Sequence, residues 1–198
     1  LPLQGTVEVV QRKQDTSYVR WEFSVQGELD VSETVGFSAT FSRSSIVPTE
    51  AGRRSFGASG LVLGGAAVRV DTRDNRRVPR SGVFYRTSYE AGSKAIDAGA
   101  GGVARREQST RITADLECAV ELWPRHVLTF AAHGREFRSS TQDPGNFFRL
   151  GGATTLRGYR EDQFAGTRVG WGGAEYRLLT SPFSYLCVFL DGGYVRTP

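Results

Sequence analysis

YVRWEFSVQ, residues 18–26, alternates apolar and polar side chains without interruption. A period of two places Val19, Trp21, Phe23 and Val25 on one face of this segment and only polar side chains on the other. The pattern predicts a β-strand with one apolar face, because a helix would repeat its apolar residues every three or four positions.

The same alternation recurs along the chain and predicts an all-β, antiparallel protein. It is seen in residues 35–41, 115–123, 126–138, 167–179 and 183–195. With the turn signals between segments, we expect nine or ten strands, and no segment carries an apolar stripe of helical period. Several segments exceed the roughly five or six residues usual for strands of soluble sheets.

Alternation alone leaves two architectures open. In a soluble barrel the apolar face forms the core, whereas in a transmembrane β-barrel it faces lipid and the charged face lines a wet lumen. The longest segment without Asp, Glu, Lys or Arg, residues 55–68, is shorter than the roughly 20 apolar residues that a spanning helix needs. It is long enough for a spanning strand.

Composition fits one domain with many short turns. The chain has 198 residues, 24 of them Gly, and a hydrophobic content of 39%. The formal net charge of +4 is spread along the chain, so no nucleic-acid footprint is visible. The chain has no Met and begins at Leu1, from which we expect a mature or trimmed piece of a longer protein.

Neither histidine nor the acidic cluster predicts a metal site. Residues 71–82 contain clustered carboxylates that would suit a cation, but Asp, Asn, Pro and Gly also build turns, and neighbouring arginines offset the charge. His126 and His133 fall on opposite faces of one predicted strand. We therefore expect a turn and structural histidines, with no metal ligand set.

The chemistry of catalysis is likewise missing from the sequence. Cys118 and Cys187 have no CxxC spacing, which favours two free thiols, with a disulfide as the alternative. No nucleophile signature such as GxSxG is present. We predict no catalytic residue, no cofactor and no enzymatic activity.

One arginine stands apart, in the glycine-rich segment LGGATTLRGY, residues 150–159. Period two places Glu175 and Asp191 on the same interior of neighbouring strands, within reach of Arg157 if the loop folds back inside. An arginine bonded to two carboxylates fixes geometry as well as energy. The alternative is an exposed arginine in a mobile loop.

Four motifs, in order, resemble those of a known family. They are the segment D-x-R-D…P-x-x-G at residues 71–82, FRLGG through LRGY at residues 148–159, GGAEYR at residues 172–177 and FLDGG at residues 189–193. This set is similar to the signature of the bacterial surface antigen superfamily of outer-membrane barrels. That superfamily includes the assembly proteins BamA and TamA, the two-partner secretion transporters and organellar relatives.

The resemblance implies a sixteen-stranded outer-membrane barrel whose sixth extracellular loop folds into the lumen. It implies a loop-lock motif, Leu156, Arg157, Gly158 and Tyr159. It also implies partners for this motif on the barrel wall, namely Glu175, Phe189, Asp191 and Gly193. On this view residues 1–198 are one β-barrel domain truncated at both ends, without the periplasmic POTRA domains and the last strands of the family.

The function that the resemblance implies is insertion or translocation of other polypeptides at the outer membrane of a Gram-negative bacterium rather than of an organelle. The partners would be outer-membrane lipid, unfolded outer-membrane or secreted polypeptide clients, and periplasmic accessory proteins that act through the absent domains. Two alternatives remain: a two-partner secretion pore, and a barrel that anchors a fused surface or enzyme domain. A soluble all-β domain is the fourth reading. Domains encoded before Leu1 would discriminate among the first three.

Overall fold

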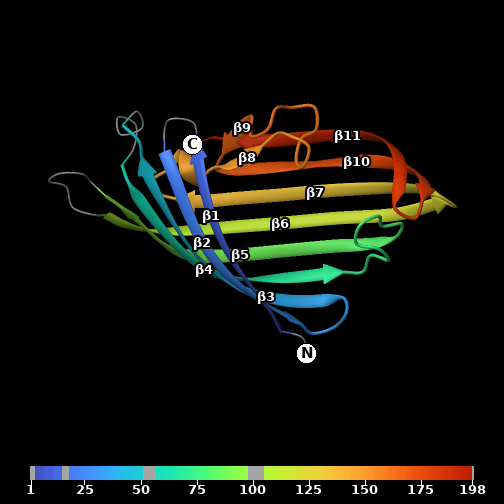
Figure 1. Cartoon of the computed structure of the whole chain (residues 1–198), viewed down its shortest axis with the longest axis horizontal. Helices are drawn as coiled ribbons and strands as arrows, with labels where there is room; N and C mark the ends of the chain where they lie inside the picture. Colours follow the sequence, from blue (N-terminus) through green and yellow to red (C-terminus); the bar gives the residue numbers. More distant parts are fainter. Residues whose placement is uncertain (1–2, 15–17, 51–56, 98–104, 198) are drawn as a thin grey trace.

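The protein folds as one curved antiparallel sheet (Figure 1). The computed structural model describes residues 3–14, 18–50, 57–97 and 105–197. Its sheet has nine strands: β1 (Leu3–Gln14), β2 (Tyr18–Asp30), β3 (Val35–Pro48), β4 (Ser59–Asp71), β5 (Gly82–Ile96), β6 (Arg105–Trp123), β7 (His126–Ser139), β10 (Arg168–Ser181) and β11 (Ser184–Arg196). Every predicted segment coincides with a strand, apart from the first residue of the segments 167–179 and 183–195, which precede β10 and β11.

The strands follow one another as a meander, with one excursion. Neighbours in sequence are neighbours in the sheet from β1 to β7, and β7 then pairs with β10. The connection between β7 and β10, residues 140–167, is here called the inner loop. It contains a single 3₁₀ turn (Pro144–Asn146) and a small two-stranded sheet of β8 (Phe148–Leu150) and β9 (Phe164–Gly166).

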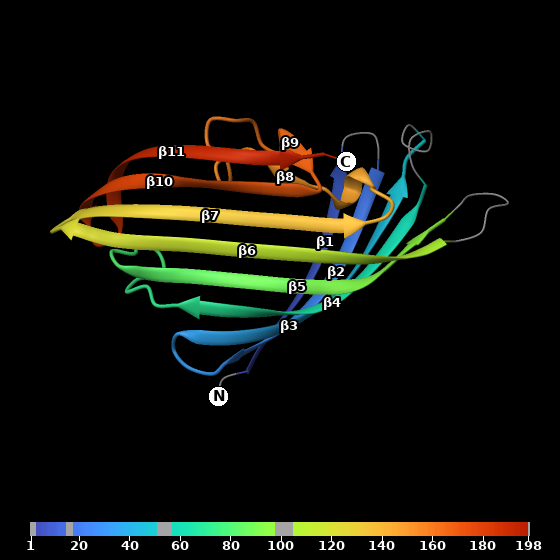
Figure 2. The ribbon, with the colours of Figure 1, turned by 180° about the vertical axis from the view of Figure 1, so that it is seen from behind.

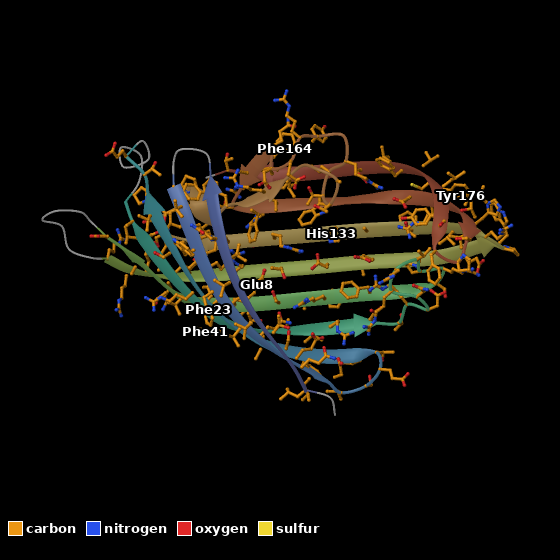
Figure 3. All side chains as sticks on the ribbon, in the orientation of Figure 1. Glu8, Phe23, Phe41, His133, Phe164 and Tyr176 are labelled. Carbon is orange, nitrogen blue, oxygen red and sulfur yellow. The ribbon has the colours of Figure 1, made fainter. Side chains whose placement is uncertain are left out.

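The two faces of the sheet differ in the way that the alternation predicts, and the apolar face is the exposed one. Trp21 and Phe41 each remain 49% exposed, whereas Arg20 and Glu22, on the opposite face of β2, are partly buried. Figure 3 places Phe23 and Phe41 on neighbouring strands, in the band of apolar side chains that covers the outer face.

The other face is concave and carries the charged residues. The sheet curls, so that β1 and β2 run obliquely to β5, β6, β7, β10 and β11, while β3 and β4 bend between the two directions (Figures 1 and 2). On the concave face, ion pairs join different strands. They include Arg69 of β4 with Glu28 and Asp30 of β2, across β3, and two pairings between neighbouring strands: Arg111 with Glu90, and Asp115 with His133 and Arg135. This arrangement is the reverse of a soluble barrel, whose interior is apolar.

Buried apolar side chains lie between the inner loop and the concave face. Leu61, Leu63 and Phe137 form one cluster, against which Phe148 of the inner loop packs. A second cluster joins Leu150 and Leu156 of the loop to Val169 of β10. The inner loop, rather than a second sheet, thus supplies the core that the concave face packs against.

No helix among the described residues is long and apolar enough to cross a membrane.

Candidate functional site

The glycine-rich part of the inner loop, residues 151–160, is here called the loop tip, and it is shaped by local contacts. Gly151 and Gly152 have φ of 120° and 96°, a region that residues with a side chain rarely adopt. The Thr155 hydroxyl accepts a hydrogen bond from the Gly151 N–H at 2.8 Å and donates one to the Gly151 carbonyl at 3.0 Å. Leu156 is buried with Leu150 and so directs the following residue at the wall.

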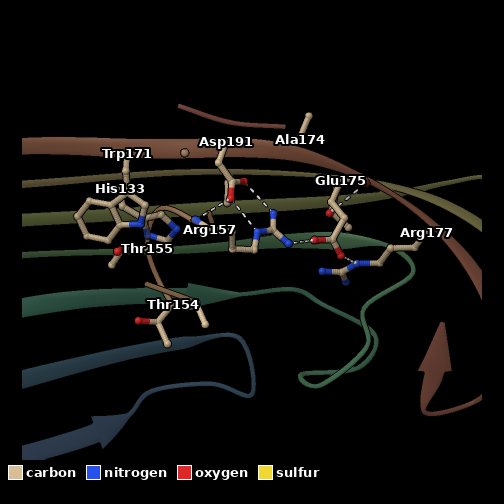
Figure 4. Close-up of a pocket in the computed structure, with 14 residues that line it drawn as sticks. His133, Thr154, Thr155, Arg157, Trp171, Ala174, Glu175, Arg177 and Asp191 are labelled. Carbon is tan, nitrogen blue, oxygen red and sulfur yellow. Dashed lines mark hydrogen bonds and ion pairs between the residues drawn. The ribbon is translucent and has the colours of Figure 1, made fainter. Parts of the chain in front are cut away.

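That following residue, Arg157, bridges two strands (Figure 4). Its Nε donates to Asp191 Oδ2 at 2.7 Å and its Nη2 donates to Asp191 Oδ1 at 2.8 Å. Its Nη1 donates to Glu175 Oε2 at 2.6 Å. Because Asp191 belongs to β11 and Glu175 to β10, one guanidinium holds the loop tip to both strands at once.

Two further contacts fix the guanidinium and its acceptor. The Arg157 guanidinium lies over the Phe189 ring, 3.5 Å from its centroid, in a cation–π contact. The other oxygen of Glu175 accepts from Arg177 Nε at 2.6 Å. Arg177, on the same face as Glu175, therefore orients this carboxylate from the side opposite Arg157.

The acidic surroundings also favour the charged form of the arginine. Hydrogen bonds to Asp191 raise the pKa of Arg157; burial opposes this effect, while Glu175 adds to it through a further hydrogen bond and its charge. The pKa therefore lies above the ordinary value for arginine, and the guanidinium stays charged at every physiological pH.

Glycines on the wall make room for this arrangement. A Cβ at Gly173 would lie 2.4 Å from Asp191 Oδ1 and 2.5 Å from the Leu190 carbonyl oxygen. A Cβ at Gly193 would lie 2.7 Å from Leu156 Cδ1. Any larger residue at these positions displaces either the carboxylate or the loop.

The last two residues of the predicted loop-lock motif have different positions. Gly158 has a φ of 89°, which lets the chain turn away from the wall after Arg157. Tyr159 is 51% exposed and packs edge-on against Phe164 of the same loop, with ring centroids 5.2 Å apart. Tyr159 thus contacts the loop itself, whereas Leu156 and Arg157 contact the wall.

A cavity of about 220 Å³ lies beside Arg157, between the loop tip and β7 and β10. Thr154, Trp171 and His133 line it, and the last two rings stack at 4.8 Å between centroids. A polar cavity of this size holds several water molecules. The residues gathered here bind one another and keep the loop in place; they do not form a nucleophile with an adjacent general base.

Other sequence predictions have plain outcomes. Residues 72–81 form the connection between β4 and β5, as predicted, in which Arg73 pairs with Asp71 at 2.9 Å and with Glu117 at 2.8 Å. His126 and His133 lie on opposite faces of β7, where they contact Tyr176 and Asp115 respectively. Both cysteines are free. Within the described residues no group of three or more His, Cys, Asp or Glu side chains is arranged to hold a metal ion.

The sequence of the chain was compared with the profiles of known protein families. The profile of the Omp85 superfamily domain matches residues 6–197. The chain belongs to the Omp85 superfamily. This membership confirms the resemblance predicted from the four motifs. A comparison with curated proteins finds no match.

Membership in the Omp85 superfamily settles the architecture. The curved sheet is that of an antiparallel transmembrane β-barrel, and its exposed apolar face is the face that meets lipid. The soluble all-β reading is wrong. Omp85 proteins are outer-membrane proteins that act in protein assembly and translocation, so the family gives the general class of function.

Sequence reasoning missed some residues of this Omp85 site. Arg177 was within reach of the same argument that found Glu175, because the two residues are on one strand face. Nothing in the sequence marks Thr155 as a site residue, because its hydrogen bonds to Gly151 depend on the conformation of the loop tip. Lys94 and Asp143, which hold the other part of the inner loop, are too far apart in sequence for any spacing rule to join them.

Proposed function

We propose that this chain is the barrel of a machine that inserts or translocates polypeptides at the outer membrane, and that Arg157 holds its inner loop in the working position. The observation that carries the proposal is the bridge from Arg157 to Asp191 and Glu175, at 2.7 Å and 2.6 Å. In this proposal residues 1–198 act as one β-barrel domain.

The direction of the barrel supports this role. At one end of the strands the connections are residues 31–34, 72–81, 124–125 and 182–183, all of them shorter than the inner loop (residues 140–167), which leaves the other end. Outer-membrane barrels have short periplasmic turns and longer loops outside. The inner loop therefore starts from the external end and folds back to lie against the concave face.

The concave face itself suits an extended polypeptide in transit. Paired arginines and carboxylates line its described part, so an unfolded segment meets a charged, wet surface there. A loop of this length has no fixed conformation without anchors. Fixed by Arg157, it limits the space on the concave side and supports β10 and β11, beside which a client segment would pass.

The lipid, the client polypeptides and periplasmic accessory proteins are the partners in this proposal, and the outer membrane of a Gram-negative bacterium is its location. The two-partner secretion pore would use the same fixed loop. Sequence encoded upstream of Leu1 separates that alternative, and the anchor of a fused domain, from an assembly factor.

The test is a charge reversal in the full-length protein. Arg157→Glu places a third carboxylate beside Asp191 and Glu175, so we expect client insertion or export to fall at least about tenfold. The measurement is the folded client in isolated outer membranes at matched barrel levels. Arg160→Glu is the matched control, because Arg160 is exposed in the same loop. Normal client handling by Arg157→Glu at an unchanged barrel level would contradict the proposal.

A further inference from the structure

The part of the inner loop before the tip, residues 141–149, is here called the loop base, and it is held by the most deeply buried charge in the described part of the chain. Lys94 of β5 has no exposed surface. Its ammonium lies 2.8 Å from Asp143 Oδ2 and donates to the Thr141 carbonyl at 2.7 Å. Ser59 of β4 donates to the same Asp143 oxygen at 2.6 Å.

This contact stabilises the fold only if it stays formed. Removing a lysine and an aspartate from water is unfavourable unless the two remain paired and hydrogen-bonded. The hydrogen bonds from Ser59 and to Thr141 meet that requirement. A loop base that detached from the wall would leave Lys94 without its partner inside the barrel.

Neighbouring strands hold the loop base at further points. Glu107 of β6 accepts a hydrogen bond from the Thr141 N–H at 2.7 Å. Arg20 of β2 donates to the Gly145 carbonyl at 2.6 Å. The loop base is therefore attached to β2, β4, β5 and β6, while the loop tip is attached to β10 and β11 through Arg157.

The two attachments share no residue and lie on different parts of the sheet. In the sheet order, β7 separates the strands that hold the base from those that hold the tip. Phe148, near the end of the base, packs against the cluster of Leu61, Leu63 and Phe137. Leu150, just before the tip, belongs to the cluster that includes Leu156 and Val169. The inner loop thus spans the concave side from one part of the wall to the other.

We propose that Lys94 is a positioning residue that forms a second, independent anchor of the inner loop with Asp143. When the Arg157 bridge opens, the loop tip moves and the loop base stays attached, so the loop shifts inside the barrel without leaving it. The contacts of Lys94 do not depend on the proposed function, but the role of a loop base that stays attached during client passage rests on that proposed function. A client that displaces the tip then finds the loop still in the lumen, ready to bind again.

The experiment is hydrogen–deuterium exchange of the full-length protein in lipid nanodiscs. The reporters are the Thr141 and Asn146 amides of the base and the Gly151 and Arg157 amides of the tip, all of them hydrogen-bonded. In Lys94→Met we expect the base amides to exchange roughly tenfold faster or more while the tip amides stay within about twofold. Arg157→Ala should give the reverse pattern.

Two additional variants make the result decisive. Arg138→Met removes an exposed ion pair with Glu136 and serves as the matched control, with no change expected in either segment. If Lys94→Met alone does not assemble, the double variant Lys94→Met/Asp143→Ala removes both charges of the pair and still frees the base. Joint acceleration of both segments in either variant, or an unchanged base in the lysine variants, would overturn the independent anchor. A failed client test of Arg157→Glu would leave this exchange result standing, so the two proposals fail separately.

Discussion

Arg157 and Arg73 use the same chemistry at different places on the wall and differ in what they hold. The partners of Arg157 lie midway along β10 and β11, whereas Arg73 lies in the connection that follows β4. Each pairs with two carboxylates and lies over a phenylalanine ring: Phe189 for Arg157 and Phe84 for Arg73. Arg73 is two residues from Asp71, so this pair closes a turn within the local sequence, while its other partner, Glu117 of β6, is 44 residues away and has a side chain that is 40% exposed. Arg157 joins a loop to strands 18 and 34 residues further along.

The difference shows which contact the structure depends on. If Arg73 is lost, Arg76 still lies 3.5 Å from Asp71. Asp74 and Asn75 also accept backbone N–H bonds across the same turn. If the Arg157 side chain is lost, Glu175 retains Arg177, but Asp191 keeps only the backbone N–H of residue 157, at 3.3 Å, within the described residues. The ion pair of Arg73 with Asp71 is therefore backed by a second arginine, whereas the ion pair of Arg157 with Asp191 is not.

The largest effect is therefore expected for Arg157→Ala. We expect the free energy of unfolding to fall by about 3 kcal/mol, because Asp191 becomes a largely buried carboxylate that keeps only the long hydrogen bond from the backbone N–H of residue 157. Urea unfolding of the barrel in phospholipid vesicles measures this change. A loss no larger than the roughly 0.5 kcal/mol of an exposed ion pair would show that the tip is held by its apolar contacts instead.

A steric change tests the same site without removing a charge. Gly173→Ala should lower the free energy of unfolding by about 2 kcal/mol, because the new Cβ meets both the Asp191 carboxylate and the Leu190 carbonyl. Gly192→Ala, one residue after Asp191, is the matched control, since a Cβ there meets nothing within 4 Å. Equal effects of the two substitutions would attribute the loss to strand glycine in general.

Much of this barrel follows from period two, and the part that does not follow has a physical reason. Residues 18–26 predict their strand because apolar side chains alternate there with polar and charged ones. Strand β4 gives a weak signal, since Gly60, Gly64 and Gly65 have no side chain to mark a face. At Gly65 a Cβ would lie 2.1 Å from the Tyr89 carbonyl oxygen, so close approach of β4 to β5 requires glycine there.

The two anchors of the inner loop differ in the same way. Period two places Glu175 and Asp191 on one wall, so the partners of Arg157 are predictable once the loop is assumed to fold inward. Nothing in the sequence pairs Lys94 with Asp143, because a loop residue has no face and the contact depends on how the loop crosses the lumen. The strand faces are local properties; the path of the loop is not.

A smaller effect is expected for Arg73→Ala, which breaks the duplicated contact. We expect a loss of about 1 kcal/mol in the free energy of unfolding, because Arg76 and the turn hydrogen bonds remain. The same urea titration measures it, side by side with Arg157→Ala. A loss as large as that of Arg157→Ala would show that the turn depends on Arg73 and would contradict the difference inferred between Arg73 and Arg157.

The smallest effect belongs to Asp74 and depends on pH. Burial raises the pKa of Asp74, but the hydrogen bonds from the backbone N–H groups of Ser81, Arg80 and Asn75 together lower it by more. The pKa therefore lies below the ordinary 3.8. Because the pKa of Asp74 is lower in the folded state, its ionised carboxylate stabilises the turn at any pH above the unfolded-state pKa. This stabilisation is lost as the pH falls through the folded-state pKa. Water screens this exposed carboxylate, so we expect a few tenths of a kcal/mol. Wild type should be that much more stable than Asp74→Asn at pH 7, and the gap should close in acid below about pH 4. A gap that stays constant down to pH 3 would mean that the side-chain amide, rather than the missing charge, weakens the turn.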